Sequence, residues 1–268
     1  MSRFDRYLVG NKFKLSRIDP GDRPCDGGTE AEEREKLDQL ATELDRLQNL
    51  LHAEGRRKLL LVLQGMDTSG KDGSIRWVFS RTSPLGVRVA AFKAPTGDEL
   101  ARDFLWRCHA VVPRAGELAV WNRSHYEDVL VPAVEGWIDR KALKRRFAQI
   151  NDFERLLSET GTTIVKCMLH ISKDEQRQRL QARIDEADKQ WKFSLGDLEV
   201  RKRWDDYQRA YQEALAATST EVAPWYVVPA DSKRQRNLMI AQLLVRTLSS
   251  MKLTPPRPDP AIAGLVVV

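Results

Sequence analysis

Short, continuous apolar runs alternate with helical patterns along most of this chain. Runs of this kind are typical of strands that are buried on both faces of a parallel sheet. The segments between them carry apolar residues at helical spacing. We therefore predict an α/β fold, in which helices cover both faces of a five-stranded parallel sheet through right-handed crossovers. The predicted strands cover residues 58–64, 87–92, 118–121, 163–171 and 225–228, and the predicted helices cover 72–81, 98–109, 126–160 with a break near Gly136, 174–185, 200–217 and 232–250.

A further helix precedes the first strand. Leucines recur at helical spacing between residues 37 and 51, Thr29 and Glu32 match a capping box, and Gly55 follows. These signals predict one amphipathic helix whose leucine stripe packs in the core. The chain before it is polar and turn-rich, which favours an arm laid over the body or partly disordered. The chain's end, AIAGLVVV, is too short to span a membrane and favours packing on the body or on a neighbouring subunit. The expected parts are an N-terminal arm over 1–28, a body over 29–253 and a C-terminal tail over 254–268.

Composition and charge exclude several classes of protein. With 42% hydrophobic and 31% charged residues, and no run near eighteen apolar residues, the chain has the composition of a soluble globular protein without a membrane span. Its start breaks the apolar positions with Arg3, Asp5 and Arg6 and so lacks a secretory signal, which favours a cytoplasmic location. Three widely spaced cysteines indicate neither a disulfide framework nor a zinc site. The net charge of +6 suits a phosphorylated or polyanionic ligand, without separating nucleic acid from nucleotide.

A glycine-rich segment directly after the first predicted strand matches the P-loop (Walker A) pattern GxxxxGK. Its glycines let the backbone N–H groups converge on phosphate oxygens, the following helix adds its positive end, and Lys71 supplies a charge to the transferred phosphoryl group. Asp72 stands where Ser or Thr usually follows the lysine, so Mg²⁺ must be held by other groups. Asp67 and Asp72 offer hard oxygen ligands, and Asp67 is alternatively suited to orient or deprotonate an attacking phosphate oxygen. The predicted phosphate-binding residues are Gly65, Asp67, Thr68, Ser69, Gly70, Lys71, Asp72 and Gly73.

A second polar group follows the third predicted strand. Asn122 and Arg123 come directly after it, and Glu127 and Asp128 follow. In P-loop proteins the second acidic motif lies here, next to the phosphates. Ser124 and Glu127 also fit a helix capping box. We expect Arg123 either to contact phosphate oxygens or to pair with Asp67 or Asp128.

Five segments together resemble the second family of polyphosphate kinases. They are GMDTSGKDG, FKAP, WNRSHYEDVLV, WKFSLGDLEVRKRWDDY and APWYVVPADSK, in that order, and the resemblance extends over residues 7–250. It implies a P-loop kinase fold in which inorganic polyphosphate is the phosphoryl donor and a nucleotide the acceptor. The APWYVVPADSK segment is most similar to the subgroup that phosphorylates both AMP and ADP. The resemblance assigns the phosphate-loop roles to Asp67, Lys71 and Asp72, and the second motif to Arg123, Glu127 and Asp128.

The related kinases also carry a mobile lid, here expected at about residues 183–200. Its cations close over the transferring group and exclude water. The candidates in this chain are Arg179, Arg183, Lys189 and Lys192, and the alternative for Arg183 is a pair with Asp185 or Glu186 on a solvated helix. Trp191 and Phe193 either pack the lid hinge, which we favour, or stack a base.

The residues and the resemblance together predict an enzyme that transfers phosphoryl groups between inorganic polyphosphate and AMP or ADP. We expect it to use Mg²⁺, with Mn²⁺ as an alternative, to form a homo-oligomer, dimer or tetramer, and to bind neither nucleic acid nor membrane. Alternatives are a polyphosphate kinase restricted to ADP or using GDP, or an ATP-dependent nucleoside monophosphate kinase, which needs no extended cationic path. A non-catalytic nucleotide or nucleic-acid binding protein has no reason to keep two acidic motifs and a cationic lid.

Overall fold

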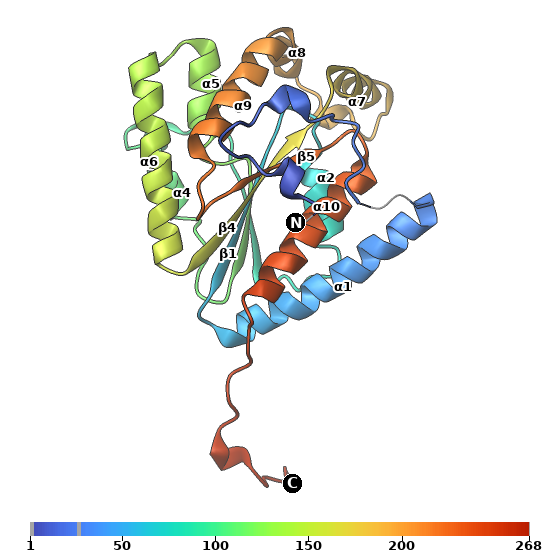
Figure 1. The fold of residues 1–268 in the computed structure, drawn as a ribbon, viewed down its shortest axis with the longest axis vertical. Coiled ribbons are helices and arrows are strands. Elements are labelled where there is room, and N and C mark those ends of the chain that lie inside the picture. Colours follow the sequence, from blue (N-terminus) through green and yellow to red (C-terminus); the bar gives the residue numbers. More distant parts are fainter. Residues whose placement is uncertain (1–2, 26–27, 268) are drawn as a thin grey trace.

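A single five-stranded sheet forms the centre of the molecule in the part of the chain that the computed structural model describes, residues 3–25 and 28–267. All neighbouring strands are parallel, in the order β2-β3-β1-β4-β5 (Figure 1). The predicted α/β fold with five parallel strands is therefore confirmed. The strands are β1 (Lys58–Gln64), β2 (Val87–Ala91), β3 (Leu118–Asn122), β4 (Thr162–His170) and β5 (Trp225–Pro229).

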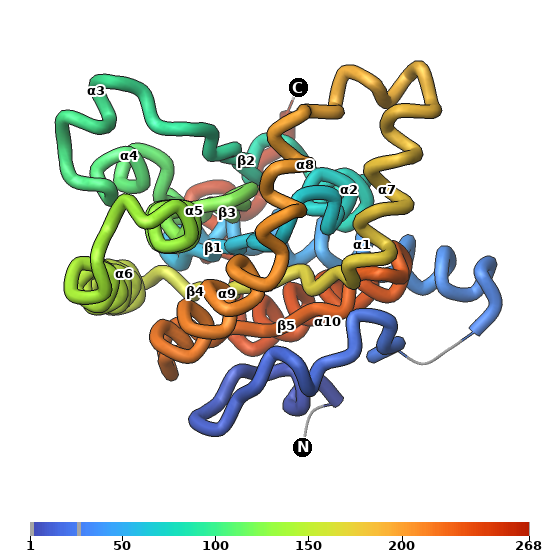
Figure 2. Tube along the Cα trace, turned by 90° about the horizontal axis from the view of Figure 1, so that it is seen from above, coloured from blue at the N-terminus to red at the C-terminus, as the bar shows by residue number. Residues whose placement is uncertain are grey.

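Helices cover both faces of this sheet, so the central strand β1 is buried along almost its whole length. One layer consists of α1 (Glu30–Glu54), α2 (Lys71–Val78) and α10 (Lys233–Ser250), which pack against one another. The opposite layer consists of α5 (Glu127–Glu135), α6 (Arg140–Glu159) and α9 (Trp204–Thr218) (Figures 1 and 2). The capping box predicted for α1 is present, with both the Thr29 and the Glu32 side chains bonded to backbone N–H groups.

Two predicted helices are each broken in two. The segment expected to be one helix over 98–109 forms α3 (Gly97–Leu100) and α4 (Trp106–His109). Between them Asp103 Oδ1 accepts a hydrogen bond from the Leu105 N–H at 3.0 Å, a local bond that competes with the helical pattern. The segment expected to be one helix over 200–217 divides at Arg203 into α8 (Leu195–Lys202) and α9. The guanidinium of Arg203 bonds to the carbonyl of Val134 and to Glu135, which ties this corner to the end of α5.

The two ends of the chain differ in how they pack. In the arm, η1 (Asp5–Tyr7) and η2 (Leu15–Arg17) bury Tyr7 and Leu15 against the body. The Val9 N–H donates to the Trp225 carbonyl at 2.9 Å, so the arm lies along β5. Residues 1, 2, 26 and 27 of the predicted arm lie outside the described residues. The tail is exposed over 254–267, includes η4 (Pro260–Ile262), and extends away from the body in Figure 1 rather than packing on it.

The elements that follow β4 lie over the carboxyl ends of the strands. They are α7 (Lys173–Asp185), η3 (Gln190–Lys192) and α8, and Figure 1 shows α7 and α8 at the end of the sheet toward which β5 points. Ligands of open parallel sheets bind at this edge. None of the helices within the described ranges is both long and apolar enough to cross a bilayer.

Candidate functional site

A cavity of about 540 Å³ lies at the carboxyl ends of the strands, between the phosphate loop and the segment from α7 to α8. It brings together most of the residues that the sequence predicted. Among its described lining residues, eight carry Lys or Arg side chains and three carry Asp, so its walls are strongly cationic. The predicted residues that line it are Asp67, Thr68, Gly70, Lys71, Asp72, Gly73, Asn122, Arg123, Arg179, Arg183, Lys189 and Lys192.

The loop conformation depends on two glycines. Gly65 has φ of 152°, and a Cβ there would lie 2.6 Å from the Leu169 carbonyl oxygen. Gly70 has φ of 102°, and a Cβ there would overlap the guanidinium of Arg236. The helix α2 begins directly after Gly70. Its first N–H groups have no partner within the helix, and they lie at the cavity where a phosphate would accept from them.

Lys71 is buried and its ammonium folds back onto the loop. Nζ donates to the Gly65 carbonyl at 2.7 Å and to the Met66 carbonyl at 3.3 Å. Burial lowers the pKa of Lys71, while the carboxylate of Asp67 acts in the opposite direction. An ammonium has three donors, so one remains for a phosphate oxygen in the cavity.

Two carboxylates of the loop pair with the end of β3. Arg123 donates to Asp67 Oδ1 at 3.0 Å, and Asn122 Nδ2 donates to Asp72 Oδ1 at 2.6 Å. Of the two carboxylates expected to pair with Arg123, Asp67 does so, whereas Asp128 pairs with Arg107. Burial acts to lower the pKa of Arg123, but the carboxylates of Glu127 and Asp67 outweigh it and raise that pKa.

The same carboxylates fit the expected divalent metal. Within residues 3–25 and 28–267, the second carboxylate oxygen of Asp67 and of Asp72 has no hydrogen-bond partner, and no group of three His, Cys, Asp or Glu side chains forms a metal cage. Mg²⁺ is commonly held by one or two carboxylates, with water and substrate phosphates completing its shell. Asp67 and Asp72 are the donors that suit this arrangement.

Glu127 and Asp128 lie behind the cavity wall rather than in it. Glu127 Oε1 accepts from Gln64 Nε2 at 3.1 Å, at the end of β1. Asp128 pairs with Arg107 at 3.2 Å, and Arg107 in turn donates to the carbonyl of Lys93, which lines the cavity. Burial raises the pKa of Asp128, although Arg107 acts to lower it. Asp128 therefore supports a lining residue through Arg107, and Glu127 acts on the lining residue Arg123 through its charge.

The turn that carries Arg123 is held in a left-handed conformation, with φ of 62° at that residue. The Ser124 hydroxyl accepts from the Tyr126 N–H at 3.2 Å, so the capping box expected between Ser124 and Glu127 does not form. A non-glycine residue at positive φ persists only where its surroundings hold it. Here the surroundings are the buried side chains directly after it.

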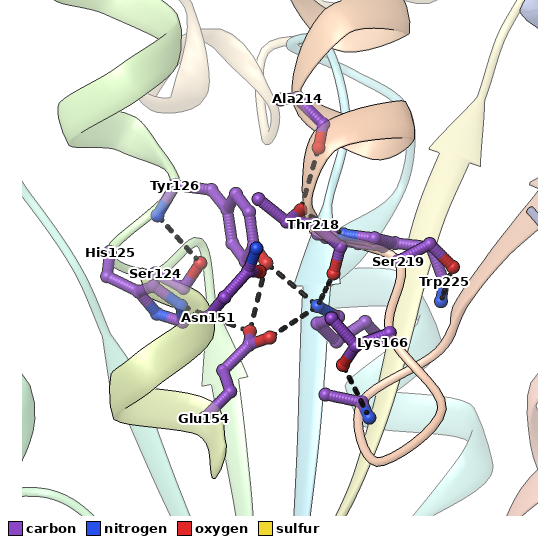
Figure 3. Close-up of polar contacts among 12 residues, drawn as sticks. Ser124, His125, Tyr126, Asn151, Glu154, Lys166, Ala214, Thr218, Ser219 and Trp225 are labelled. Atoms are coloured by element: carbon purple, nitrogen blue, oxygen red, sulfur yellow. Dashed lines mark hydrogen bonds and ion pairs between the residues drawn. The ribbon is translucent and has the colours of Figure 1, made fainter. Parts of the chain in front are cut away.

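A buried polar network holds this turn from behind (Figure 3). Lys166 Nζ, fully buried on β4, donates to the Tyr126 hydroxyl at 2.8 Å, to Glu154 Oε2 at 2.6 Å and to the Thr218 carbonyl at 2.7 Å. Burial acts to raise the pKa of Glu154, but Lys166 and His125 outweigh it and lower that pKa. Burial lowers the pKa of His125, whose Nε2 lies 3.2 Å from Glu154 Oε1. His125 is thus buried behind the turn and does not line the cavity.

The four cations predicted for the lid have different positions. Arg179 faces the loop from behind, where its guanidinium donates to the carbonyls of Thr68, Ser69, Ala230 and Asp231 and pairs with Glu175 at 2.7 Å. Arg183 donates to Asp197 at 3.2 Å and to the Lys192 carbonyl at 3.1 Å. The pairs proposed for it with Asp185 or Glu186 are therefore replaced by Asp197 of α8. Lys189 pairs with Glu186 instead.

Trp191 is 78% exposed and lines the cavity, so the expectation that it packs the lid hinge is wrong. Lys192 Nζ lies 4.9 Å from the centre of its ring. An exposed indole at a cavity mouth is suited to stack on a planar ligand group.

Several residues of the site were not predicted. Lys93 and Lys233 line the cavity, and they belong to the FKAP and APWYVVPADSK segments that the sequence already singled out. Asp197 lines it as the partner of Arg183. Arg236 lies beneath the loop on α10, and nothing in its sequence context distinguishes it from a surface arginine.

The chain matches known proteins over almost its whole length. The sequence model of the family described as polyphosphate kinase 2 matches residues 28–256. The chain is 51% identical over 262 residues to the AMP/ADP-polyphosphate phosphotransferase of Meiothermus ruber, with 98% of each chain covered. It is 44% identical over 237 residues to the ADP-polyphosphate phosphotransferase of Rhodopseudomonas palustris, with 83% of this chain and 82% of the relative covered. Its fold matches the crystal structure of polyphosphate kinase 2 from Arthrobacter aurescens TC1 with a TM-score of 0.94 and 48% identity, covering 97% of this chain and 93% of that one.

Proposed function

This chain belongs to the polyphosphate kinase 2 family, and from that premise we propose that it transfers phosphoryl groups between inorganic polyphosphate and the nucleotides AMP and ADP, forming ADP and ATP. The observation that carries the proposal is the excess of cationic side chains in the cavity beyond the phosphate loop. Arg183, Lys189 and Lys192 continue the positive charge of Lys71 and Arg123 along the lid. A long polyanion needs such a path, whereas a compact donor such as ATP does not.

The relatives support this choice of substrates. A relative that is named for both AMP and ADP matches the chain over 98% of its length, and one named for ADP matches 83%. Among the described lining residues, the indole of Trp191 is exposed, so a base stacked on it is open to solvent on one side. A base that is held only by stacking can shift by one phosphate, which lets the α-phosphate of AMP and the β-phosphate of ADP reach the same point.

Phosphoryl transfer needs positioning and charge neutralisation more than covalent help from the protein. In our proposal the loop N–H groups and the free donor of Lys71 hold phosphate oxygens, and Arg123 stabilises the charge of the transferring group. The lid closes with Arg183, Lys189 and Lys192 over the chain and excludes water. Asp67 and Asp72 hold Mg²⁺, or alternatively Mn²⁺, which when bound neutralises phosphate charge. Glu127 and Asp128 support the lining residues from behind.

The proposal is tested by incubating AMP, and separately ADP, with polyphosphate and Mg²⁺ in the absence of ATP, in a preparation free of adenylate kinase. We expect AMP to give ADP and then ATP. ADP that accumulates without ATP, or AMP that stays untouched while ADP reacts, contradicts the use of both acceptors. Phosphorylation of AMP by ATP alone would support the ATP-dependent alternative instead. GDP in place of ADP tests the choice of base.

We also propose that the protein is a cytoplasmic homo-oligomer, a dimer or tetramer. The tail supports an assembly, because its apolar side chains are exposed over residues 261–267. Size-exclusion chromatography with light scattering should give two or four times the chain mass of 30.7 kDa. A single-chain mass at micromolar concentration contradicts this part of the proposal.

A further inference from the structure

Arg236 is a buried cation beneath the phosphate loop. Its side chain extends from the second turn of α10, and the residue is 2% exposed. The guanidinium donates to the Ser69 carbonyl at 3.1 Å and to Asn237 Oδ1 at 3.1 and 3.0 Å. Across the described part of the chain it forms no ion pair with any carboxylate. Its acceptors are therefore neutral.

The guanidinium is pressed against the turn of the loop. A Cβ at Gly70 would overlap it, and a Cβ at Gly73 would lie 3.4 Å from it. Asn237 Oδ1 also accepts from the Ser74 hydroxyl at 3.1 Å, so the same amide oxygen joins Arg236 to α2. Arg236 is thus fixed against the loop backbone, while it is not among the described residues that line the cavity.

The charge of Arg236 is costly where it lies. A buried charge without an opposite partner is unfavourable by several kcal/mol in general. Burial lowers the pKa of Arg236 to about 9, and the neighbouring Arg179 acts in the same direction, so the group is still charged at pH 7. Arg179 has Glu175 as a partner, but no second carboxylate accompanies this pair of arginines in the described residues.

We propose that Arg236 is a positioning residue whose buried charge finds its counter-charge only when a phosphate chain occupies the loop, so that it raises the affinity of the loop for polyanions. This inference rests on the proposed function, since the anion is taken to be polyphosphate. Arg236 acts through the loop backbone that it holds and through its charge, without contact with the reacting atoms. A purely structural brace of Ser69 would contribute to folding alone and would leave affinity unchanged.

The test compares polyphosphate binding, without nucleotide, in the unaltered protein, Arg236→Met and Arg236→Lys. Affinity is measured by the rise in unfolding temperature as polyphosphate is titrated. We expect Arg236→Met to weaken binding at least tenfold and Arg236→Lys, which keeps the charge, to stay within about threefold. Both variants lose bonds to Ser69, so a lower unfolding temperature without ligand is expected and does not discriminate. If Arg236→Met does not fold, Arg236→Gln provides the neutral side chain.

Arg88→Met is the matched control. Arg88 is a partly buried arginine on β2 that does have a carboxylate partner, Glu117, at 3.1 Å beside the amino end of β3. We expect it to lower the unfolding temperature and to leave polyphosphate affinity unchanged. Equal affinity in Arg236→Met and the unaltered protein would overturn the inference while leaving the proposed function intact. No binding of polyphosphate to the unaltered protein would overturn the proposed function and the inference with it.

Discussion

Lys71 and Arg123 lie at the mouth of the same loop but have different partners. Lys71 donates to two carbonyls of the loop itself, and Arg123 pairs with the carboxylate of Asp67. A phosphate in the cavity competes with neutral acceptors for the first and with an anion for the second. Both side chains end in donors that can turn to a developing negative charge.

We expect Lys71→Ala and Arg123→Ala each to lower kcat by about two orders of magnitude or more. A hydrogen-bond donor aimed at transition-state charge typically lowers the activation barrier by about 3–4 kcal/mol. Unfolding temperature should change little by comparison, because Arg123 is partly exposed and the hydrogen-bond partners of the buried Lys71 are two neutral carbonyls of its own loop. Steady-state rates with ADP and polyphosphate, beside thermal unfolding, provide the measurement.

Lys141→Ala is the control for these two variants, since Lys141 is an exposed cation on α6. Its turnover should equal that of the unaltered protein. Near-normal turnover in Lys71→Ala or Arg123→Ala would remove that residue from the mechanism.

At the scale of elements, the pair of Lys166 and Glu154 joins β4 to α6, and through Tyr126 and Thr218 it reaches α5 and α9. Both charges are fully buried, at 0% and 1% side-chain exposure. Removal of one charge leaves the other buried in the core without an opposite charge. The same elements carry the turn of Arg123, so this pair connects stability to the site.

We expect Glu154→Gln to lower the free energy of unfolding by about 3–5 kcal/mol, as breaking buried pairs does. The double variant Glu154→Gln/Lys166→Met removes the stranded charge and should be more stable than Glu154→Gln alone. Urea unfolding measures both. If the double variant loses as much free energy of unfolding as Glu154→Gln and Lys166→Met lose in total, the unpaired buried charge is not the cause of the instability of Glu154→Gln. Asp152→Asn, in an exposed pair with Arg155, should leave the midpoint nearly unchanged.

The strands and most helices could be predicted from the sequence because periodicity and capping are local signals. The leucine stripe of α1 and the apolar runs of the sheet needed no knowledge of distant partners. The breaks at Asp103 and Arg203 could not be predicted, since they depend on a side-chain bond to the backbone and on contacts with α5. The resemblance makes Arg179 a candidate lid cation, but its actual partners include carbonyls of two distant loops.

The site followed from motifs where the chemistry is encoded in consecutive residues. Asp67, Lys71 and Asp72 belong to one loop, and their neighbour Asn122 follows directly after a strand. Arg236 had no such signal, because an arginine near the start of a helix is usually solvated. Its burial results from the close packing of α10 on α2 and on the glycines of the loop. Fold packing alone determines that contact.

At the scale of the whole molecule, eight of the 44 Lys and Arg side chains line one cavity, against three carboxylates there. Polyphosphate affinity should therefore fall steeply with added salt, because several Lys and Arg side chains release counterions when the polyanion binds. Binding of AMP should fall less. Titrations of both ligands at several salt concentrations between about 50 and 300 mM give, for each ligand, the slope of log Kd against log salt concentration. Equal slopes contradict an extended cationic path.

Lowering the pH should destabilise the fold already at pH values above those at which carboxylates take up protons. Burial lowers the pKa of His170 from 6.5 to about 4 and also lowers that of His125. As the pH falls below the pKa that these histidines have in the unfolded chain, the unfolded chain binds more protons than the folded one. The free energy of unfolding therefore falls. Between about pH 7.5 and pH 5.5 His170 alone should account for about 1 kcal/mol.

Urea unfolding at the two pH values, in the unaltered protein and in His170→Gln, measures this loss. The variant should show a smaller decrease, while His52→Gln, at an exposed histidine, should match the unaltered protein. An identical pH dependence in all three would show that His170 does not take part.

The arm that lies along β5 has its partners almost at the opposite end of the chain. Leu15 N–H donates to Gln212 Oε1 at 2.6 Å, across 197 residues of sequence, and Val9 bonds to Trp225. During synthesis on the ribosome the arm emerges first, and β5 emerges among the last elements. Leu15 and Val9 therefore lack their partners on α9 and β5 while the other four strands are made. Docking of the arm is thus a closing step of folding, and it covers the edge of β5 that a second unfinished chain would otherwise pair with.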